Sequence, residues 1–378
     1  MDPRRKVIIL YASAGYGHEK AARALLEAYQ AGEKDAEVQI YDTLGFTSRF
    51  FGRLYGKLYL FLIRWFPWFW GLLYYASDIG WVYLFLKPIR RLMNGGLLRR
   101  LETFLAEEDP AVILSTHFMS TEVVSYLKQK KRLQSRLITV VTDYLPHWIW
   151  TAPRVDAYVV AIEETKKALV ARGVRAEKVH VLGIPVEIKF LRKHSKDELA
   201  LKLNIKKDVF TLLLTSSGAG VGDTEAIAES ILALERPVQM LIVCGMNRNL
   251  FARLEWCFKN NERIRVFGFV NNMEELMEVS DVVIGKAGGL TITESFAKGK
   301  PVILYQSVPG QEARNVACVL EYQAGYAARS PHEVVKCLKE LIGYPEKRKA
   351  LQIGIRKMSR SEAAAAITKL AEHEIRRK

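Results

Sequence analysis

Residues 281–315 constrain the fold of this chain more than any other segment. A short apolar strand at 282–284 leads into Gly288 and Gly289 and then into a helix, and a second strand follows at 301–305. A strand that feeds a helix through a glycine turn, followed by another strand, is the building unit of a parallel α/β sheet. The segment therefore predicts an α/β fold in which helices cover both faces of the sheet.

The same alternation of strand and helix runs through the chain in two series. With 378 residues, the chain is also longer than one ordinary hydrophobic core supports, so two domains are expected. The first series contains strands at 6–12, 38–41, 112–115, 137–142, 157–161 and 178–182, with a helix at 18–31. The second series contains strands at 209–215, 238–243, 264–267, 282–284 and 302–305.

We therefore predict an α/β fold of two doubly wound, Rossmann-like domains that face a cleft. The predicted parts are an N-terminal domain at 1–188 with an aromatic and basic helical insertion at 48–100, a linker at 189–208, a C-terminal domain at 209–350, and terminal helices at 351–378 that pack back on the N-terminal domain. Ligands of such sheets bind beyond the carboxyl ends of the strands, so a site is expected in the cleft.

The composition indicates a folded protein of a reducing compartment. The net charge of +15 comes from 56 basic and 41 acidic residues, but no RNA- or DNA-binding motif accompanies it, so nucleic acid is not an expected partner. The cysteines are widely spaced and form neither a metal-ligand pattern nor a disulfide framework. The apolar run near the N-terminus is short and ends in a glycine loop, which predicts a first strand and not a signal peptide. We expect a cytoplasmic setting.

The glycine turn at Gly288 and Gly289 has the chemistry of a phosphate site. Glycines let a ligand approach the backbone, and the amides of the first helical turn carry partial positive charge. Glu294, one turn into the helix, is placed to accept hydrogen bonds from a ribose diol, although a glutamate on a helix surface is the alternative. Gln311 and Glu312 follow a Pro-Gly turn and suit sugar hydroxyls. Together these residues indicate a nucleotide-sugar site.

A second glycine loop, at 215–226, repeats the strand–glycine–helix arrangement. Its hydroxyls and amides, including Ser217 and Gly218, suit a diphosphate, but a tight turn that requires glycine is the alternative. The loop lacks the lysine and the spacing of a Walker A motif, so ATP hydrolysis gains no support. The chain contains no Asp-x-Asp motif, which argues against a divalent-metal clamp on a diphosphate. We predict no metal and no cofactor, with backbone amides and helix termini holding the diphosphate.

The first glycine loop, at 13–17, ends at His18 in the first turn of a helix. A histidine at a loop tip that faces the cleft is suited to proton transfer near neutral pH. A histidine that caps the helix or is merely exposed is the alternative.

Residues 50–86 are dense in aromatic side chains, and basic residues lie within and after them. The stretch 58–77 approaches the length of a transmembrane helix, but Arg64 and Pro67 interrupt it and the aromatic residues are spread throughout. We predict helices that lie in a membrane interface, with aromatic rings inserted and basic groups facing anionic headgroups. The alternative is a helical hairpin in the core of the N-terminal domain.

Four motifs resemble a known family of enzymes. The loop SAGYGHEKAA at 13–22 resembles the GGGH-xx-A loop of the monogalactosyldiacylglycerol synthases and the bacterial processive diacylglycerol glucosyltransferases, in glycosyltransferase family 28. TDYLPHWIW at 142–150 is similar to that family's TD-xxx-H-xx-W stretch. KAGGLTITES at 286–295 and VPGQEARN at 308–315 resemble its donor-binding segments.

The resemblance implies a two-domain GT-B fold and inverting transfer of a hexose from a UDP-sugar donor to a lipid hydroxyl. The enzyme would be peripheral, at the cytoplasmic face of the cell membrane, with a diacylglycerol-type lipid as acceptor and an anionic membrane surface as partner. It implies His18 as the general base or its relay, and Asp143 as the group that orients or helps it. UDP-hexose is a substrate here, so the implied cofactor set is empty.

The remaining roles implied by the resemblance concern the donor and the acceptor. The diphosphate would be lined by Ser217, Gly218, Gly288, Gly289, Leu290 and Thr291, with Gly17 also on the donor side; Glu294 would bind the ribose, Gln311 and Glu312 the sugar, and Phe269 with Val270 the uracil. On the acceptor and membrane side, the resemblance implies Tyr16, and it places His147 and Trp150 on the lipid-facing side, whereas Trp65, Trp68 and Trp70 are expected there from the aromatic stretch itself.

The chain departs from the family pattern at three positions. Ala14 and Tyr16 stand where family members often have glycines, and Ala287 stands where many have proline. Tyr16 narrows the first loop, which bears on how an acceptor approaches. Two other activities stay open from the sequence: transfer of N-acetylglucosamine to a polyprenyl-linked acceptor, and epimerisation of a UDP-sugar. Glucose, galactose and N-acetylglucosamine donors are not distinguished.

Overall fold

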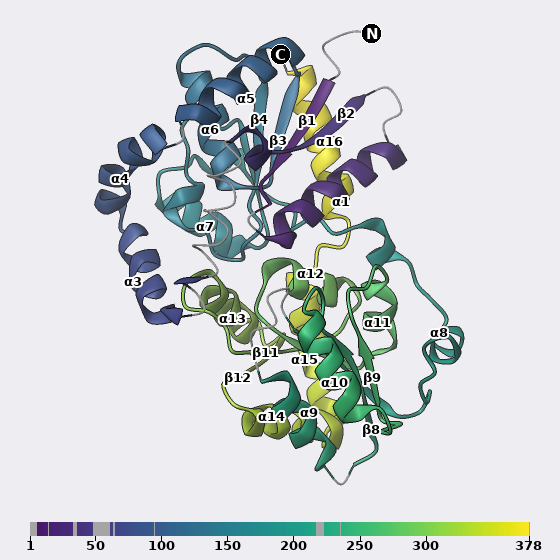
Figure 1. Cartoon of the computed structure of the whole chain (residues 1–378). Helices are drawn as coiled ribbons and strands as arrows, with labels where there is room; N and C mark the ends of the chain where they lie inside the picture. The colour runs from purple at the N-terminus through teal and green to yellow at the C-terminus, as the bar shows by residue number, and fades with distance from the viewer. Residues whose placement is uncertain are drawn as a thin grey trace. The chain divides into compact units, whose positions relative to one another are not determined.

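The computed structural model describes residues 6–13, 15–32, 36–47, 61–62, 65–93, 95–216, 223–234 and 236–377, and only the backbone at residues 87 and 89–98. The chain forms two compact α/β units (Figure 1). The first comprises Met1–Ile188 together with Val308–Arg314 and Arg360–Lys378. The second comprises Lys189–Ser307 and Asn315–Ser359. Each unit contains one six-stranded parallel sheet, so the predicted α/β two-domain fold class is confirmed.

The sheet of the first unit has the strand order β2-β1-β3-β4-β5-β6, and its neighbouring strands are parallel. Its strands are β1 (Lys6–Tyr11), β2 (Glu37–Asp42), β3 (Val112–Ser115), β4 (Arg136–Val140), β5 (Ala157–Val160) and β6 (Val179–Val181). All six lie where the sequence predicts them. The strands β1, β3, β4 and β5 are mostly apolar and buried because helices cover both faces of the sheet there, whereas the edge strand β2 carries polar residues and is only partly buried.

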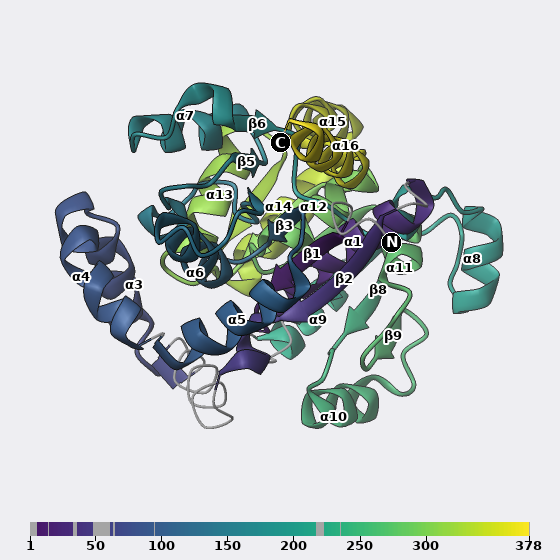
Figure 2. The same ribbon diagram turned by 90° about the horizontal axis from the view of Figure 1, so that it is seen from above.

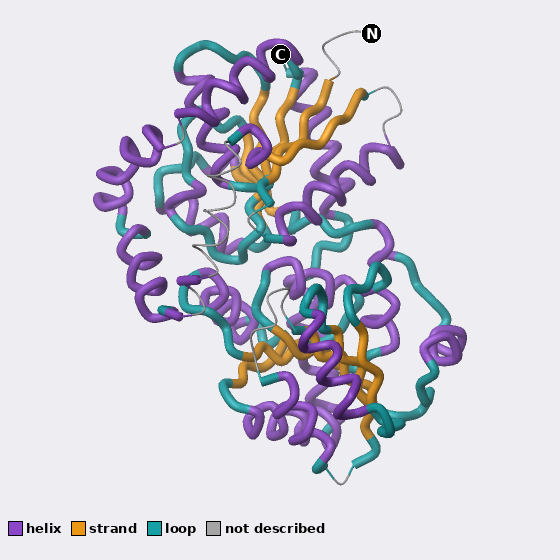
Figure 3. Tube along the Cα trace, in the orientation of Figure 1, coloured by secondary structure: helices purple, strands orange, loops and turns teal. Residues whose placement is uncertain are grey.

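Helices of the first unit pack on this sheet or lie at the margin of the unit, and Figure 3 shows them by colour. They are α1 (Tyr16–Gly32), α3 (Pro67–Ser77), α4 (Gly80–Met93), α5 (Gly95–Glu108), α6 (Phe118–Gln129), α7 (Glu163–Ala171) and α16 (Ala363–Arg376). Short 3₁₀ turns lie at η2 (Thr43–Phe46), η3 (Trp148–Trp150) and η4 (Ala176–Lys178). In Figures 1 and 2, α3 and α4 lie at the margin of this unit, away from its sheet.

The two faces of β1 pack into different parts of the core. Ile8 and Leu10 pack with residues of α5 and α6, whereas Val7 and Ile9 pack with residues of α1 and α16. This alternation follows from the two-residue period of a strand. The terminal helix α16 thus covers the first sheet, and Gly183 makes room for it. A Cβ atom at Gly183 would lie 2.4 Å from the Cβ of Arg360, and its φ of +99° also favours glycine.

The sheet of the second unit has the strand order β12-β11-β10-β7-β8-β9. Its strands are β7 (Phe210–Thr215), β8 (Val238–Val243), β9 (Ile264–Phe267), β10 (Val282–Gly285), β11 (Val302–Tyr305) and β12 (Gly325–Ala328). The sequence analysis predicts five of these strands and misses β12. That strand reads Gly-Tyr-Ala-Ala and pairs with one neighbour, so it lacks the run of large β-formers that marks a buried central strand.

Helices cover both faces of the second sheet as well. The covering helices are α9 (Thr224–Leu232), α10 (Arg248–Phe258), α11 (Met273–Val279), α12 (Gly289–Ala297), α13 (Gln311–Glu321), α14 (Pro331–Gly343) and α15 (Pro345–Met358), and α8 (Lys196–Leu203) lies away from the sheet in Figure 1. The first residues of α13 belong to the first unit and the rest to the second. Residues 189–208, where the sequence suggests a linker, contain the 3₁₀ turn η5 (Ile188–Leu191) and α8, and belong almost wholly to the second unit.

Candidate active site

Three neighbouring strands bring polar side chains together at one edge of the first sheet. His18 follows β1 and lies in the first turn of α1, Thr116 follows β3, and Thr142 follows β4. Because β1, β3 and β4 are adjacent and parallel, their carboxyl ends meet at the same edge. Residues that are about 100 positions apart in the sequence therefore surround one imidazole ring.

Hydrogen bonds fix the protonation pattern of His18. Its Nδ1 lies 2.8 Å from the carbonyl oxygen of Thr116 and 3.1 Å from the hydroxyl oxygen of Thr142. A carbonyl oxygen only accepts hydrogen bonds, so Nδ1 carries the hydrogen and Nε2 keeps a free lone pair. Burial lowers the pKa of His18 to about 4, with the Thr116 carbonyl opposing that shift. The ring is thus neutral at pH 7 and ready to accept a proton at Nε2.

Asp143 lies beside this histidine but is not bonded to it. Between these two described residues no hydrogen bond is present; Trp150 contacts both, since its Nε1 donates to the Asp143 carboxylate over 3.4 Å and its ring centroid lies 6.3 Å from that of His18. Burial raises the pKa of Asp143 to about 6, and the bond from Trp150 opposes the rise. The carboxylate is therefore charged at pH 7 but protonates more readily than an ordinary aspartate.

Trp150 and His147 lie inside the first unit and do not face a lipid phase. Trp150 is 1 % exposed and packs in the core on the α6 side of the sheet. His147 is also buried; its Nδ1 accepts from the amide of Ile149, and its Nε2 donates to the carbonyl oxygen of Tyr74 over 3.0 Å. The expectation that these two residues lie on the lipid-facing side is therefore corrected. Trp150 packs beside His18, and His147 bonds to α3.

Large aromatic side chains gather on the outer surface of α3 and α4. Trp68 on α3 is 68 % exposed, Trp81 on α4 is 73 % exposed, and Trp65 just before α3 is exposed as well. Trp70 is only partly buried. Trp81 and Phe85, from the same aromatic stretch, are exposed as well and extend this surface beyond the three tryptophans named above. Within the described part of the chain, no helix combines the length and the apolar character needed to cross a bilayer.

The inner side of this helix pair is fixed by one buried carboxylate. Asp78, between α3 and α4, accepts from the amide of Trp148, from Arg172 over 3.1 Å, and from Arg314. Arg314 belongs to the Val308–Arg314 segment of the first unit, and its guanidinium also lies 5.1 Å from the ring of Tyr74. A carboxylate shared by two arginines in a buried place anchors the helices through charge-assisted hydrogen bonds.

In the second unit, the predicted phosphate turn lies at the carboxyl end of β10. Gly285 ends that strand, where a Cβ atom would come within 2.3 Å of the Thr215 hydroxyl at the end of β7, so the position requires glycine. Gly288 precedes α12 with extended backbone and no side chain that caps the helix. The first-turn amides of Gly289, Leu290 and Thr291 are therefore those that a helix leaves without intrahelical partners.

The structure also identifies a residue that supports this turn. Asn315 is buried on α13, and its side-chain amide donates to the carbonyl oxygen of Ala287 over 2.9 Å. In the sequence, Asn315 could have been noticed because it lies four residues after Gln311 in the same motif. Sequence spacing alone does not show which carbonyl oxygen its side chain contacts. Glu294 is 4 % exposed on α12, so it is not the surface glutamate of the alternative interpretation.

The other predicted donor residues are spread over several loops and turns. Phe269 and Val270 follow β9, and Phe269 is exposed at the carboxyl edge of the second sheet. Gln311 is exposed, and the Glu312 carboxylate accepts from the amide of Val308 over 2.8 Å, which shapes the turn before α13. Ser217 and Gly218 lie outside the described residues. Gly17 and Tyr16 lie in the first turn of α1, where Tyr16 is exposed.

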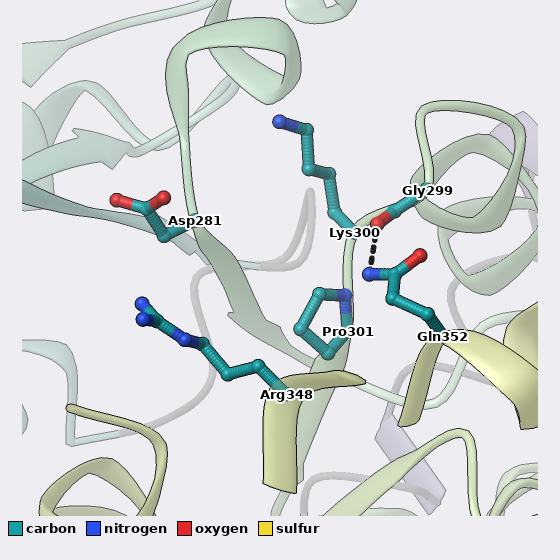
Figure 4. A pocket seen from close by; sticks show the side chains of 6 residues that line it. All are labelled: Asp281, Gly299, Lys300, Pro301, Arg348 and Gln352. Atoms are coloured by element: carbon teal, nitrogen blue, oxygen red, sulfur yellow. Dashed lines mark hydrogen bonds between the residues drawn. The ribbon is translucent and has the colours of Figure 1, made fainter. Parts of the chain in front are cut away.

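A cavity of about 310 Å³ lies at the opposite edge of the second sheet (Figure 4). It is lined by Asp281 and by Lys300, which precede β10 and β11, and by Arg348 and Gln352 of α15. Lys300 donates to the carbonyl oxygen of Glu278 over 2.8 Å, and burial lowers its pKa to about 8. Because ligands of doubly wound sheets bind at the carboxyl edge, this cavity at the amino edge is not the donor site.

Comparison with known proteins identifies the family. The chain is 31% identical over 375 residues to the processive diacylglycerol β-glucosyltransferase of Bacillus cereus, covering 98% of this chain and 94% of that enzyme. It is 34% identical over 245 residues to the enzyme of the same name from Staphylococcus aureus, a match that spans 65% of this chain and 62% of the relative. This chain belongs to the monogalactosyldiacylglycerol synthase and processive diacylglycerol glucosyltransferase family.

Two family models divide the chain in the same way as the sequence motifs. The monogalactosyldiacylglycerol synthase model matches residues 18–186, and the C-terminal domain model of glycosyltransferase family 28 matches residues 224–363. The first match begins at His18 and includes Asp143. The second includes the glycine turn of α12 and Glu294. The predicted family is therefore confirmed over both units of this glycosyltransferase.

A solved structure shows the same fold at low sequence identity. The Staphylococcus aureus MnaA–UDP co-structure superposes with a TM-score of 0.65 and 14% identity, covering 98% of this chain and 97% of that one. At this identity the likeness concerns the fold. Among the residues that the structure describes, no group of three or more histidine, cysteine, aspartate or glutamate side chains is placed to hold a metal ion.

Proposed function

We propose that this glycosyltransferase moves a hexose from a UDP-sugar to the hydroxyl of diacylglycerol, with inversion at the anomeric carbon. The observation that carries the proposal is a neutral imidazole with a free Nε2 at the carboxyl edge of the first sheet, in a chain similar over nearly its whole length to a processive diacylglycerol β-glucosyltransferase. Such a histidine is suited to remove the proton of an alcohol as it attacks.

The proposed reaction is one in-line displacement. The acceptor oxygen forms a bond to the anomeric carbon while the bond from that carbon to the diphosphate oxygen breaks, and UDP leaves with the electron pair. Nε2 of His18 takes the hydroxyl proton, and the Nδ1 hydrogen bond to the Thr116 carbonyl stabilises the imidazolium that forms. The nearby Asp143 carboxylate is charged at pH 7, and its negative charge also stabilises the imidazolium.

The departing diphosphate gains negative charge, which the start of α12 is suited to stabilise. Its first-turn amides and the positive end of the helix dipole lie at the glycine turn that Asn315 holds in place. Glu294 remains our proposed ribose ligand, with Gln311 and Glu312 for the sugar and Phe269 with Val270 for the uracil. We propose that neither a metal ion nor a further cofactor takes part.

A membrane surface would supply the acceptor, since diacylglycerol is scarce in water. The exposed rings of Trp65, Trp68 and Trp81 have the chemistry of interfacial anchors, and the net charge of +15 favours anionic headgroups. We therefore propose peripheral attachment at the cytoplasmic face of the cell membrane, with the outer surface of α3 and α4 in contact with lipid.

One assay tests the proposal against its rivals. Purified protein is incubated with labelled UDP-glucose, UDP-galactose or UDP-N-acetylglucosamine and with vesicles that contain diacylglycerol, a polyprenyl-linked acceptor or neither. With vesicles that contain diacylglycerol we expect labelled hexosyl-diacylglycerol with β configuration, and far less of it with His18→Ala. Product only with the polyprenyl-linked acceptor supports the N-acetylglucosamine transferase, and conversion of the UDP-sugar without lipid supports an epimerase. Either result rejects the proposal.

A further inference from the structure

A cluster of buried hydroxyl groups lies beneath the turn that holds His18. Its members are Ser115 on β3, Thr139 on β4, and Ser120 and Thr121 on α6, and each is 0 % exposed. Ser115 and Thr139 are register partners in adjacent strands. The interior of a parallel sheet is usually filled by valine, isoleucine and leucine, so four hydroxyls gathered there are unusual.

These hydroxyl groups form one connected network. Thr121 donates to Ser115 over 2.9 Å and lies 3.1 Å from the hydroxyl of Thr139. The hydroxyls of Ser115 and Ser120 are 2.8 Å apart, and each has the carbonyl oxygen of His117 as an acceptor at 2.9 Å. The network therefore converges on one backbone carbonyl, in the turn between β3 and α6.

The preceding residue of that turn, Thr116, holds both the ring and the backbone carbonyl of His18. Thr116 accepts the Nδ1 hydrogen of His18 through its carbonyl oxygen and donates through its hydroxyl to the His18 carbonyl over 3.0 Å. The ring of His117 packs edge-on against the His18 ring, with centroids 4.6 Å apart. Any shift of the Thr116–His117 turn would therefore move the acceptor that sets the His18 tautomer.

We propose that Ser115, Ser120, Thr121 and Thr139 are positioning residues, which fix the Thr116–His117 turn and thereby aim Nε2 of His18 at the acceptor hydroxyl. This inference rests on the proposed function for the role of His18 in the reaction. Hydrogen bonds between neutral buried groups add little net stability, because the same groups bond to water in the unfolded chain. Their direction, in contrast, matters for proton transfer, where small displacements of a catalytic group reduce the rate strongly.

The double variant Ser115→Ala/Ser120→Ala tests this role. It removes both hydroxyl donors to the His117 carbonyl, but the amide of Thr121 still donates to that oxygen, so no buried carbonyl is left without a partner. We expect kcat to fall about tenfold, with the KM for the UDP-sugar and the urea midpoint little changed. The matched control is Ser125→Ala on the same helix, α6. It removes a buried hydroxyl that donates to the carbonyl oxygen of Pro153, and we expect it to leave kcat unchanged.

A second measurement does not depend on turnover. In protein labelled with ¹⁵N-histidine, the ring nitrogen shifts of His18 report which nitrogen carries the hydrogen. We expect the Nδ1–H form in the wild type and in Ser125→Ala, and a mixture of both forms in Ser115→Ala/Ser120→Ala. An unchanged tautomer together with an unchanged kcat overturns the inference, as does a kcat loss matched by a lower urea midpoint. If the wild type makes no lipid product but the double variant still shows the mixture of tautomers, only the proposed function is rejected.

Discussion

The surroundings of His18 and the outer surface of α3 and α4 belong to the same unit but are built in opposite ways. Around His18, hydrogen bonds to Nδ1 fix the orientation of the ring and leave Nε2 available, and even the adjacent tryptophan, Trp150, is buried. On α3 and α4, large rings such as Trp68 and Trp81 are exposed, whereas the hydrogen bonds of Asp78 lie on the inner side. The first arrangement fixes direction, which a proton transfer needs. The second offers apolar area without fixed direction, which suits a fluid surface.

The strongest test of this difference is to remove the imidazole of His18. We expect His18→Ala to lower kcat by about 1,000-fold, because positioned acid–base groups contribute roughly 10²–10⁴-fold. Association with vesicles and binding of UDP should not change. Steady-state transfer assays and vesicle sedimentation measure the two properties. The exposed His332→Ala on α14 is the control, and equal rates for all three proteins would remove His18 from the mechanism.

Asp78, which ties α3 and α4 to the rest of the first unit, should matter more for the free energy of unfolding than for activity. Asp78→Ala leaves Arg172 and Arg314 without their shared carboxylate, and breaking a buried ion pair from one side costs about 3–5 kcal/mol. Urea unfolding followed by tryptophan fluorescence measures the change. Glu177→Ala, which removes an exposed partner of Arg175, is the control and should cost no more than ~1 kcal/mol. A small effect of Asp78→Ala would show that α3 is held by packing alone.

The outward rings should matter for membrane attachment and not for the chemistry. We expect the double variant Trp68→Ala/Trp81→Ala to weaken binding to anionic vesicles by ~100-fold, since two rings that leave an apolar phase lose about 3 kcal/mol. Trp256→Ala removes a ring that is 72 % exposed on α10 and is the matched control. Equal vesicle binding of both variants would contradict a lipid-facing role of α3 and α4.

The smallest expected effect concerns the pH dependence of stability. Burial lowers the pKa of His18 to about 4, so the folded state resists protonation that the unfolded chain accepts below 6.5. This contribution lowers stability as the pH falls from 6.5 to 4. Burial raises the pKa of Asp143 to about 6, so the folded state takes up a proton that the unfolded chain takes up only near 3.8. This contribution raises stability over nearly the same range, and the two oppose each other.

Single variants should separate these two contributions. Relative to the wild type, Asp143→Asn should lose stability as the pH falls from 6.5 to 4.5, whereas His18→Gln should gain stability over the same range, each by ~1–3 kcal/mol. Urea unfolding at the two pH values measures both. If both variants follow the wild-type pH dependence, neither group is buried as the structure describes.

The sequence predicted the type of each unit but not every element. The apolar runs of β1 and β7 and the glycine turns after them have a local signature, so eleven of the twelve strands in the described part of the chain could be found. The edge strand β12 could not, because it is short, contains one large β-forming residue, Tyr326, and pairs with β11 alone. The same limit applies to Trp150, whose motif suggested a lipid-facing ring, while its burial depends on the packing of α6 and β5 around it.

What the sequence alone determined is local: the alternation of strand and helix, the glycine turn before α12, and the motifs that mark the family. The tertiary structure decided which nitrogen of His18 carries the hydrogen, which carbonyl Asn315 holds, and which arginines share Asp78. Those contacts join residues that are 98, 28 and 94 positions apart. Local spacing does not encode such pairs, because they form only when parallel strands and their helices bring distant turns to the same edge.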